Sequence, residues 1–146
     1  MISLRKVALA GLVMFSQAQA AQIHFTAVNN LPNSIHISIV ELTENLSYCD
    51  QGLVSGAMCR ESVAVDDQLQ RLQFRIFVEV EVAPHDRRGT FEDLDVVLSQ
   101  DIPAYITIQA TPPQSENGRE ALASEPTAEY ISRLITINQE PYQEQD

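Results

Sequence analysis

A long alternating segment at residues 69–82 is the feature that most constrains how this chain can fold. Apolar side chains occupy every second position, and charged or polar side chains fill many of the positions between them. The apolar series is Leu72, Phe74, Ile76, Val78, Val80 and Val82. A period of two, with β-branched and aromatic residues dominating one side, predicts a half-buried β-strand and excludes a regular amphipathic helix.

Six other segments have the character of strands, which gives about seven in all. They span residues 22–29, 35–41, 58–65, 91–98, 104–110 and 130–138. Asn and Pro at residues 29–34 favour a turn, so the simplest link between the first two strands is a hairpin. Because the chain has no internal repeat and no βαβ spacing, we expect an all-β fold, an antiparallel two-sheet sandwich.

The expected sandwich is immunoglobulin-like in size and strand number, but it lacks the hallmarks of that fold. The chain has no Trp, and its two cysteines lie close together in the sequence. We expect a single β-sandwich domain at residues 21–138 and a polar C-terminal tail at residues 139–146. Residues 119–124 are compatible with one helical turn before Pro126.

The first twenty residues predict export. Arg5 and Lys6 precede an apolar run at residues 7–15, and Ala18 and Ala20 are the small residues that a signal peptidase requires. We therefore predict a secretory signal peptide at residues 1–20, with cleavage near Ala20 and a secreted or periplasmic product. The alternative, a membrane anchor, is disfavoured because the apolar run is about half of the roughly 20 residues that span a bilayer.

The charge balance limits the classes of partner. The 146-residue chain has a formal net charge of -11, and removing residues 1–20 takes away one Arg and the only Lys, leaving 7 Arg against 20 acids, or -13. So acidic a chain argues against binding to nucleic acid or to anionic membranes, because both require a basic surface. It favours basic partners or divalent cations. Without Lys, mechanisms that depend on a Schiff base or a P-loop are excluded.

The two cysteines, Cys49 and Cys59, are ten residues apart in a segment that contains Gly52 and Gly56. In an oxidising compartment this short spacing predicts a disulfide that stabilises the fold by roughly 2 to 3 kcal/mol. A metal or redox role is the alternative, but the segment contains no C-x-x-C motif and no His.

Three histidines raise the question of a metal site. In the expected hairpin, His24 and His36 would lie about 13 Å apart along the strands, too far to share one ion. His85 falls in the expected loop at residues 83–89, beside a basic tip formed by Arg87 and Arg88. This tip is either an element of specific recognition or an ordinary turn, and its composition favours an ordinary turn.

Hydrophobic matching selects a register between residues 69–82 and 91–98. It places Val78 opposite Leu94 and Ile76 opposite Val96. The same register brings six outward side chains together as a candidate interaction face: Phe77, Glu79, Glu81, Phe91, Asp93 and Asp95.

In this register Glu79 would lie opposite Asp93, Glu81 opposite Phe91, and Asp95 opposite Phe77. Opposed like charges cost a few tenths to about 1 kcal/mol, a cost that a bound group would offset. The functional interpretations are a docking surface for a basic protein or a weak Ca²⁺ site. The other interpretation, which is favoured from the sequence, is a solvated face whose charges prevent aggregation.

No catalytic or cofactor motif stands out in the sequence. The chain contains no G-x-S-x-G, and we expect neither an enzyme nor a bound cofactor. The leading hypothesis is an exported protein-binding module that acts on another exported protein. The alternatives are an assembly subunit of a surface appendage or adhesin, completed by an incoming strand, and, third, a small secreted hydrolase.

Overall fold

The computed structural model describes residues 21–65, 70–99, 101–113 and 127–140. The predicted signal peptide at residues 1–20 and the predicted helical turn at residues 119–124 lie outside these ranges. The same holds for residues 141–146 of the predicted tail.

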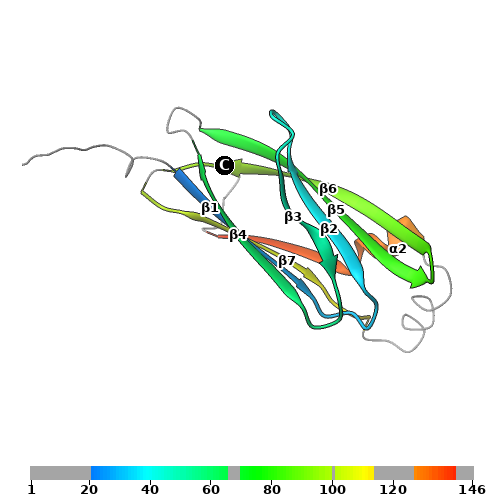
Figure 1. Cartoon of the computed structure of the whole chain (residues 1–146). Helices are drawn as coiled ribbons and strands as arrows, with labels where there is room; N and C mark the ends of the chain where they lie inside the picture. Colours follow the sequence, from blue (N-terminus) through cyan, green and yellow to red (C-terminus); the bar gives the residue numbers. More distant parts are fainter. Residues whose placement is uncertain (1–20, 66–69, 100, 114–126, 141–146) are drawn as a thin grey trace, which may run out of the picture.

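Two four-stranded sheets pack face to face as a sandwich (Figure 1). Sheet A has the strand order β4-β1-β7-β8, and sheet B has the order β3-β2-β5-β6. The strands are β1 (Ala21–Asn29), β2 (Ile35–Glu41), β3 (Ser47–Leu53), β4 (Met58–Val65), β5 (Arg71–Ala83), β6 (Asp86–Val97), β7 (Ala104–Ala110) and β8 (Ile135–Glu140). The predicted sandwich is confirmed, with eight strands instead of about seven. Neighbouring strands are antiparallel except for the pair β1 and β7, which is parallel.

The alternating pattern produces the core, as expected. Every second residue of β1, β2 and β7 is buried, and β5 buries the series from Phe74 to Val80. At the centre, Phe25 of sheet A packs edge to face on Phe74 of sheet B, with ring centroids 5.2 Å apart, and Tyr48 joins the cluster. Each large apolar side chain buried in this way stabilises the fold by about 1.5–3 kcal/mol.

The predicted hairpin between the first two strands is wrong. β1 pairs with β4 and β7, whereas β2 pairs with β3 and β5, so the link between β1 and β2 crosses from one sheet to the other. Alternation along each strand is the same whether two consecutive strands pair or face each other across the core. The pattern therefore could not separate the two arrangements.

Asn29, which is fully buried, fixes this crossing. Its side-chain amide donates hydrogen bonds to the carbonyl oxygens of Asn33 and Leu53, and its Oδ1 accepts one from the backbone N–H of Leu31. The link from β3 to β4 also crosses between the sheets here, and the N–H of Gly56 donates to the carbonyl of Asn29. One buried side chain thus ties together both crossings at this end of the sandwich.

The disulfide between Cys49 and Cys59 is confirmed, but its role is larger than that of a local loop closure. Cys49 lies on β3 and Cys59 on β4, which are edge strands of opposite sheets, so the bond joins the two sheets along one side. Cys49 sits at a bulge in the pairing of β2 with β3 and has a left-handed backbone, with φ of 51°. The bulge lets Cys49 turn into the core next to Tyr48, where strict alternation would have pointed one of them outward.

Sequence reasoning also misplaced the last elements. The predicted strand at residues 130–138 is instead a short helix, α2 (Ala128–Ser132), followed by β8. Thr127 caps the helix, because its hydroxyl accepts a hydrogen bond from the N–H of Tyr130. Ile131 and Leu134 are buried, and their three-residue spacing suits a helical turn better than a strand.

Glu41 is the one buried carboxylate among the described residues, with 5% of its surface exposed. It lies at the start of the turn between β2 and β3, and its two oxygens accept hydrogen bonds from the N–H groups of Thr43 and Glu44 at 2.7 and 2.8 Å. Burial alone would raise the pKa of Glu41, but these backbone hydrogen bonds outweigh it and lower the pKa.

We predict that the double variant Cys49→Ala/Cys59→Ala unfolds with a free energy lower by about 2–3 kcal/mol, because the unfolded chain regains the freedom that the bond removes. The measurement is urea unfolding with and without dithiothreitol. The reductant should destabilise the wild type to a similar extent and leave the variant unchanged. Equal stabilities of the oxidised wild type and the variant would contradict the prediction.

We predict that Glu41 makes stability sensitive to acid. A carboxyl whose pKa is lowered by folding stabilises the protein above its unfolded pKa, and the stabilisation disappears as the pH falls through the folded pKa. Glu41→Gln should therefore destabilise the protein at pH 7 by about 1–2 kcal/mol, because an amide offers one acceptor where two are needed.

The difference between wild type and Glu41→Gln should shrink as the pH falls from the ordinary Glu pKa of 4.5 through the lower pKa of folded Glu41. Denaturant unfolding across pH 3 to 7 measures this. Glu129→Gln, which changes a solvent-exposed carboxylate of α2, is the matched control. Parallel stability curves for wild type and Glu41→Gln over the whole range would overturn the assignment.

Candidate interaction face

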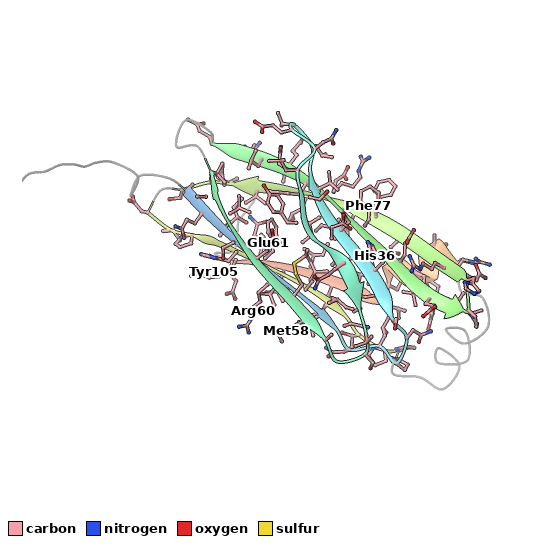
Figure 2. The ribbon with its side chains drawn as sticks, viewed as in Figure 1. His36, Met58, Arg60, Glu61, Phe77 and Tyr105 are labelled. Atoms are coloured by element: carbon pink, nitrogen blue, oxygen red, sulfur yellow. A yellow bond between two sulfur atoms is a disulfide. The ribbon has the colours of Figure 1, made fainter. Side chains whose placement is uncertain are left out.

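The six residues predicted to form the candidate interaction face all lie on the outer surface of sheet B, on β5 and β6, and all are exposed. Phe77 and Phe91 stand out, because 39% and 55% of their surfaces are exposed. Phe77 projects from this side of the sandwich, while Arg60 and Tyr105 project from the outer side of sheet A (Figure 2).

The register that led to this face is shifted by four residues. Val78 pairs with Thr90, not Leu94, and Ile76 pairs with Glu92, not Val96. β6 begins at Asp86, so the expected seven-residue loop at residues 83–89 is a tight turn through Pro84 and His85. Turn length fixes the register of a hairpin, and it overrides hydrophobic matching here. Because the shift is an even number, the same side chains still point outward.

The true register places the two aromatic side chains directly opposite each other. Phe77 pairs with Phe91, and their ring centroids are 5.8 Å apart. The guanidinium carbon of Arg75 lies 4.6 Å from the centroid of Phe91, within the range of a cation–π contact. Phe77, Phe91 and Arg75 therefore form one continuous exposed cluster, which we call the aromatic patch.

The predicted opposition of carboxylates is wrong. Asp93 lies opposite Arg75 and Asp95 opposite Gln73, so neither Glu79–Asp93 nor Asp95–Phe77 is a facing pair, and Glu81 faces Arg87 instead of Phe91. Arg75 donates two hydrogen bonds to Asp93, from Nε at 2.7 Å and from Nη2 at 3.1 Å. This hydrogen bonding lowers the pKa of Asp93.

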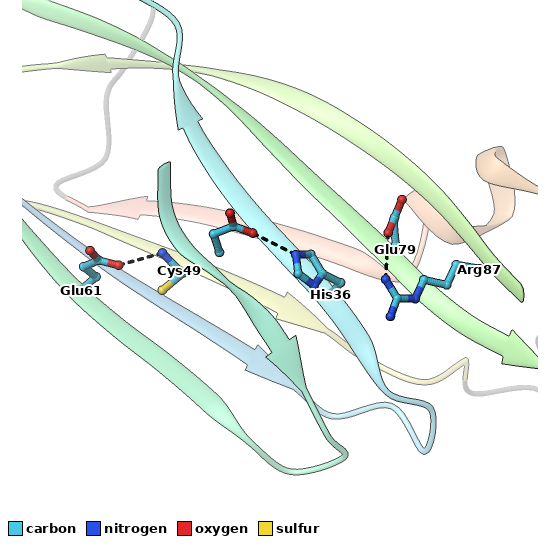
Figure 3. A network of polar contacts seen from close by, with 6 residues as sticks. His36, Cys49, Glu61, Glu79 and Arg87 are labelled. Carbon is cyan, nitrogen blue, oxygen red and sulfur yellow. Dashed lines mark hydrogen bonds and ion pairs between the residues drawn. The ribbon is translucent and has the colours of Figure 1, made fainter. Parts of the chain in front are cut away.

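Two more ion pairs lie around the aromatic patch. Arg71 lies 3.6 Å from Asp95, and Arg87 lies 3.6 Å from Glu79 (Figure 3). Gly89 faces Glu79, and a Cβ at Gly89 would lie only 2.8 Å from the Glu79 Cγ. The missing side chain thus leaves room for Glu79 to lie across β6 toward Arg87. Such exposed pairs contribute about 0–1 kcal/mol each, so their main effect is to neutralise the face.

The predicted basic tip is also engaged in ion pairs. Arg88 contacts Asp86 at 2.6 Å, and Arg87 contacts Glu79 as described above. His85 lies at the turn with a positive φ of 65°, next to Pro84, which fits a turn of the type that Pro initiates. The geometry of the tip is therefore that of a hairpin turn.

Neighbouring strands extend the face. Ser38 of β2 pairs with Phe77, and His36 pairs with Glu79. His36 Nε2 lies 2.9 Å from the Asp50 carboxylate of β3 (Figure 3). Sequence reasoning missed Arg71 and Arg75 as members of the face, although their outward position was visible in the alternation of β5. If a two-residue turn at Pro84 is assumed from the sequence, the resulting register predicts the partners of both Arg residues.

The histidines lie apart from one another. His24 is on the outer side of sheet A, where it stacks on Tyr105 at 4.9 Å and contacts the Ser62 hydroxyl at 2.7 Å, whereas His36 is on the outer side of sheet B. The expected distance of about 13 Å between His24 and His36 therefore assumed a pairing of β1 with β2 that does not exist.

Within the described ranges, one cluster of three side chains of the kinds that bind metal ions is found, and it lies at the disulfide. It comprises Cys49, Cys59 and Glu61. The two sulfurs are bonded to each other, and Glu61 Oε1 accepts a hydrogen bond from the Cys49 N–H at 2.7 Å (Figure 3). Glu61 therefore satisfies the backbone group that the bulge releases from the ladder. The acids of the candidate face do not gather into such a group, and a weak Ca²⁺ site stays a prediction.

Most of the face is an open sheet surface with projecting rings, and only Phe91 at its border also lines a cleft, on the side toward β8. Small-molecule sites are typically concave and enclose most of their ligand. An exposed aromatic cluster surrounded by charged groups is the arrangement found where one protein surface meets another.

Two broader observations bear on the location of the protein. The disulfide is compatible with an oxidising, exported location. In the described ranges, no helix is both long enough and apolar enough to cross a membrane. No protein-family model matches the chain, and no curated protein matches it significantly.

Proposed function

We propose that the protein is an exported protein-binding module, whose interface is centred on the aromatic patch of sheet B. The observation that carries the proposal is the pair of exposed, mutually contacting rings of Phe77 and Phe91 within a surround of ion pairs. Interfaces typically have an apolar centre rich in aromatic residues and Arg, with a polar rim.

The energetics favour the rings as the anchoring groups. A few central aromatic or Arg side chains usually supply most of the binding free energy, and the rim excludes water from them. Arg75 belongs to both parts, because it covers one side of Phe91 while it donates to Asp93. It is thereby held in one orientation, which reduces the entropy that binding would cost.

The charge of the face and the charge of the whole chain affect binding differently. Three Arg (Arg71, Arg75, Arg87) balance four acids (Glu79, Glu81, Asp93, Asp95) on the face, for a local sum of -1. The whole chain carries -11, so its long-range field attracts a basic partner while the contact surface itself is almost neutral. Such a field accelerates encounter more than it tightens the final complex, and the association rate should fall with salt.

The predicted export of the protein agrees with this proposal. The predicted signal peptide and the disulfide both suit a protein that works in an oxidising compartment, and its partner would be another exported protein. The proposal involves no catalytic step and no cofactor. The second candidate, an assembly subunit completed by an incoming strand, is favoured by the free edge of β8, which is treated below.

We predict that Phe77→Thr/Phe91→Thr loses its partner while it stays folded. Threonine suits an exposed strand, but truncating central aromatic side chains should weaken binding by at least about tenfold. The measurement is affinity capture from an extract of exported proteins, with the amount of captured partner quantified against the wild type.

Tyr105→Thr is the matched control, since Tyr105 is an exposed aromatic residue on the outer side of the opposite sheet. It should capture as much partner as the wild type. Light scattering of the isolated protein should show a monomer at all concentrations. Equal capture by the double variant and the control, or no specific partner for the wild type, would refute the proposal.

A further inference from the structure

The sandwich has four edge strands, and three of them carry features that block the addition of another strand. β3 has the bulge at Cys49, and β4 has a charged residue on its inner side, because Glu61 pairs with the buried Phe25 yet is itself exposed. β6 has a charged residue on its inner side, because Glu92 pairs with the buried Ile76 yet is itself exposed. Bulges and inward charges are the usual protections of an edge.

The fourth edge strand, β8, has none of these protections. Its inward residues are Ile135, Ile137 and Gln139, all half-buried, and they carry no charge. Its pairing with β7 is regular, with no bulge. β8 is therefore the edge of this sandwich that is best suited to accept another strand.

The pairing with β7 shows which backbone groups of β8 point outward. The N–H of Thr111 donates to the carbonyl of Leu134, which makes these two a hydrogen-bonded pair of the antiparallel ladder. Such pairs alternate, so residues 136, 138 and 140 also bond to β7. The N–H and C=O groups of Ile135, Ile137 and Gln139 then point to the free edge, where no other strand of the described ranges pairs with them.

A cleft opens beside this edge. Its volume is about 360 Å³, and its apolar lining comes mainly from Ile76 and Val78 of β5 and from Ile135 and Ile137 of β8. Thr90, Phe91 and Glu92 of β6 and Ser132 of α2 line the same cleft. A strand added to β8 would point every second side chain inward, toward this cleft.

Gln139, the next inward residue along β8, supplies an independent observation. Its side-chain nitrogen is buried, and it has no hydrogen-bond partner among the described residues. A buried amide donor without a partner costs about 1–3 kcal/mol. An acceptor brought by an added strand would remove that cost.

We propose that the free edge of β8 binds an extended segment of another polypeptide as an additional strand of sheet A. Two alternate aliphatic side chains of that segment enter the cleft, an acceptor side chain reaches Gln139, and a basic side chain meets Glu92. The cleft borders the aromatic patch, because Phe91 lines it. The strand site is nevertheless defined by the backbone of β8, so amide exchange at β8 tests it separately from partner capture by the two rings.

The partner is a different polypeptide and not a second copy of this chain. Self-pairing would bring together two chains of net charge -11. The β8 sequence, Ile-Thr-Ile-Asn-Gln-Glu, also has no basic residue to place near Glu92. Charge complementarity therefore favours a neutral or basic segment.

Residue-resolved amide hydrogen exchange of the oxidised, full-length protein tests the proposal. In the free protein, the amides of Ile135, Ile137 and Gln139 should exchange at least about tenfold faster than those of residues 136 and 138. The probe is the peptide Lys-Thr-Val-Thr-Val-Thr-Gln-Thr-Lys, which presents Lys, Val, Val, Gln and Lys on one side. At millimolar concentration it should slow the three amides at least about tenfold, and a peptide with the same residues in non-alternating order should not.

Gln139→Pro removes one outward N–H and leaves the bonds to β7 in place, so it should abolish the protection of Ile135 and Ile137 by the probe. Gln139→Val keeps the N–H and should still bind, several-fold more weakly. The wild-type exchange data decide the matter even if the proline variant fails to fold.

Three results would overturn the inference. The outward amides could already be as protected as their neighbours in the free monomer, in which case the chain covers its own edge. The alternating peptide could protect no better than the non-alternating one. Finally, protection could appear with rising protein concentration alone, together with a dimer in light scattering, which would make a second copy the occupant.

Discussion

The covalent link between β3 and β4 is the constraint on which the rest of the structure depends. A sandwich of two open sheets has two lateral sides, and the disulfide closes only one of them. The bulge at Cys49, with its left-handed backbone, makes the disulfide possible. Glu61 of the opposite sheet accepts a hydrogen bond from the Cys49 N–H, which the bulge leaves without a partner in the strand pairing. Cys49 thus links both sheets, and no disulfide joins them on the opposite side, between β6 and β8.

Much of the fold could be predicted from alternation, because a half-buried strand must alternate. The bounds of the strands at Ile35, Met58 and Ala104 follow directly from it. The assignment of strands to sheets could not be predicted, since alternation does not report which neighbour a strand pairs with. Asn29, a polar residue that looked like part of a turn, is the buried group that makes the chain cross between sheets.

The candidate face shows a different limit. Its six residues could be predicted because an even shift of the strand register leaves the same side chains on the outer side of the sheet. Their cross-strand partners could not be predicted, because apolar residues face each other at more than one even shift. Pro84 determines the register, because the tight turn that it initiates places Phe77 opposite Phe91 and Asp93 opposite Arg75. A face expected to be acidic and strained is instead nearly neutral, with rings at its centre. β8 went unrecognised as a separate strand because its isoleucines were merged with the helix before it.

The parallel pair at the centre of sheet A has a consequence for the order of folding. β1 is the first strand of the sandwich, yet Ile23 lies beside Ala104, 81 residues later in the chain. Closing so long a loop is slow, and sheet A cannot form around β1 until β7 is available. The cysteines, by contrast, are only ten residues apart and can meet early. Sheet B, whose four strands end at Val97, can therefore form before sheet A is complete.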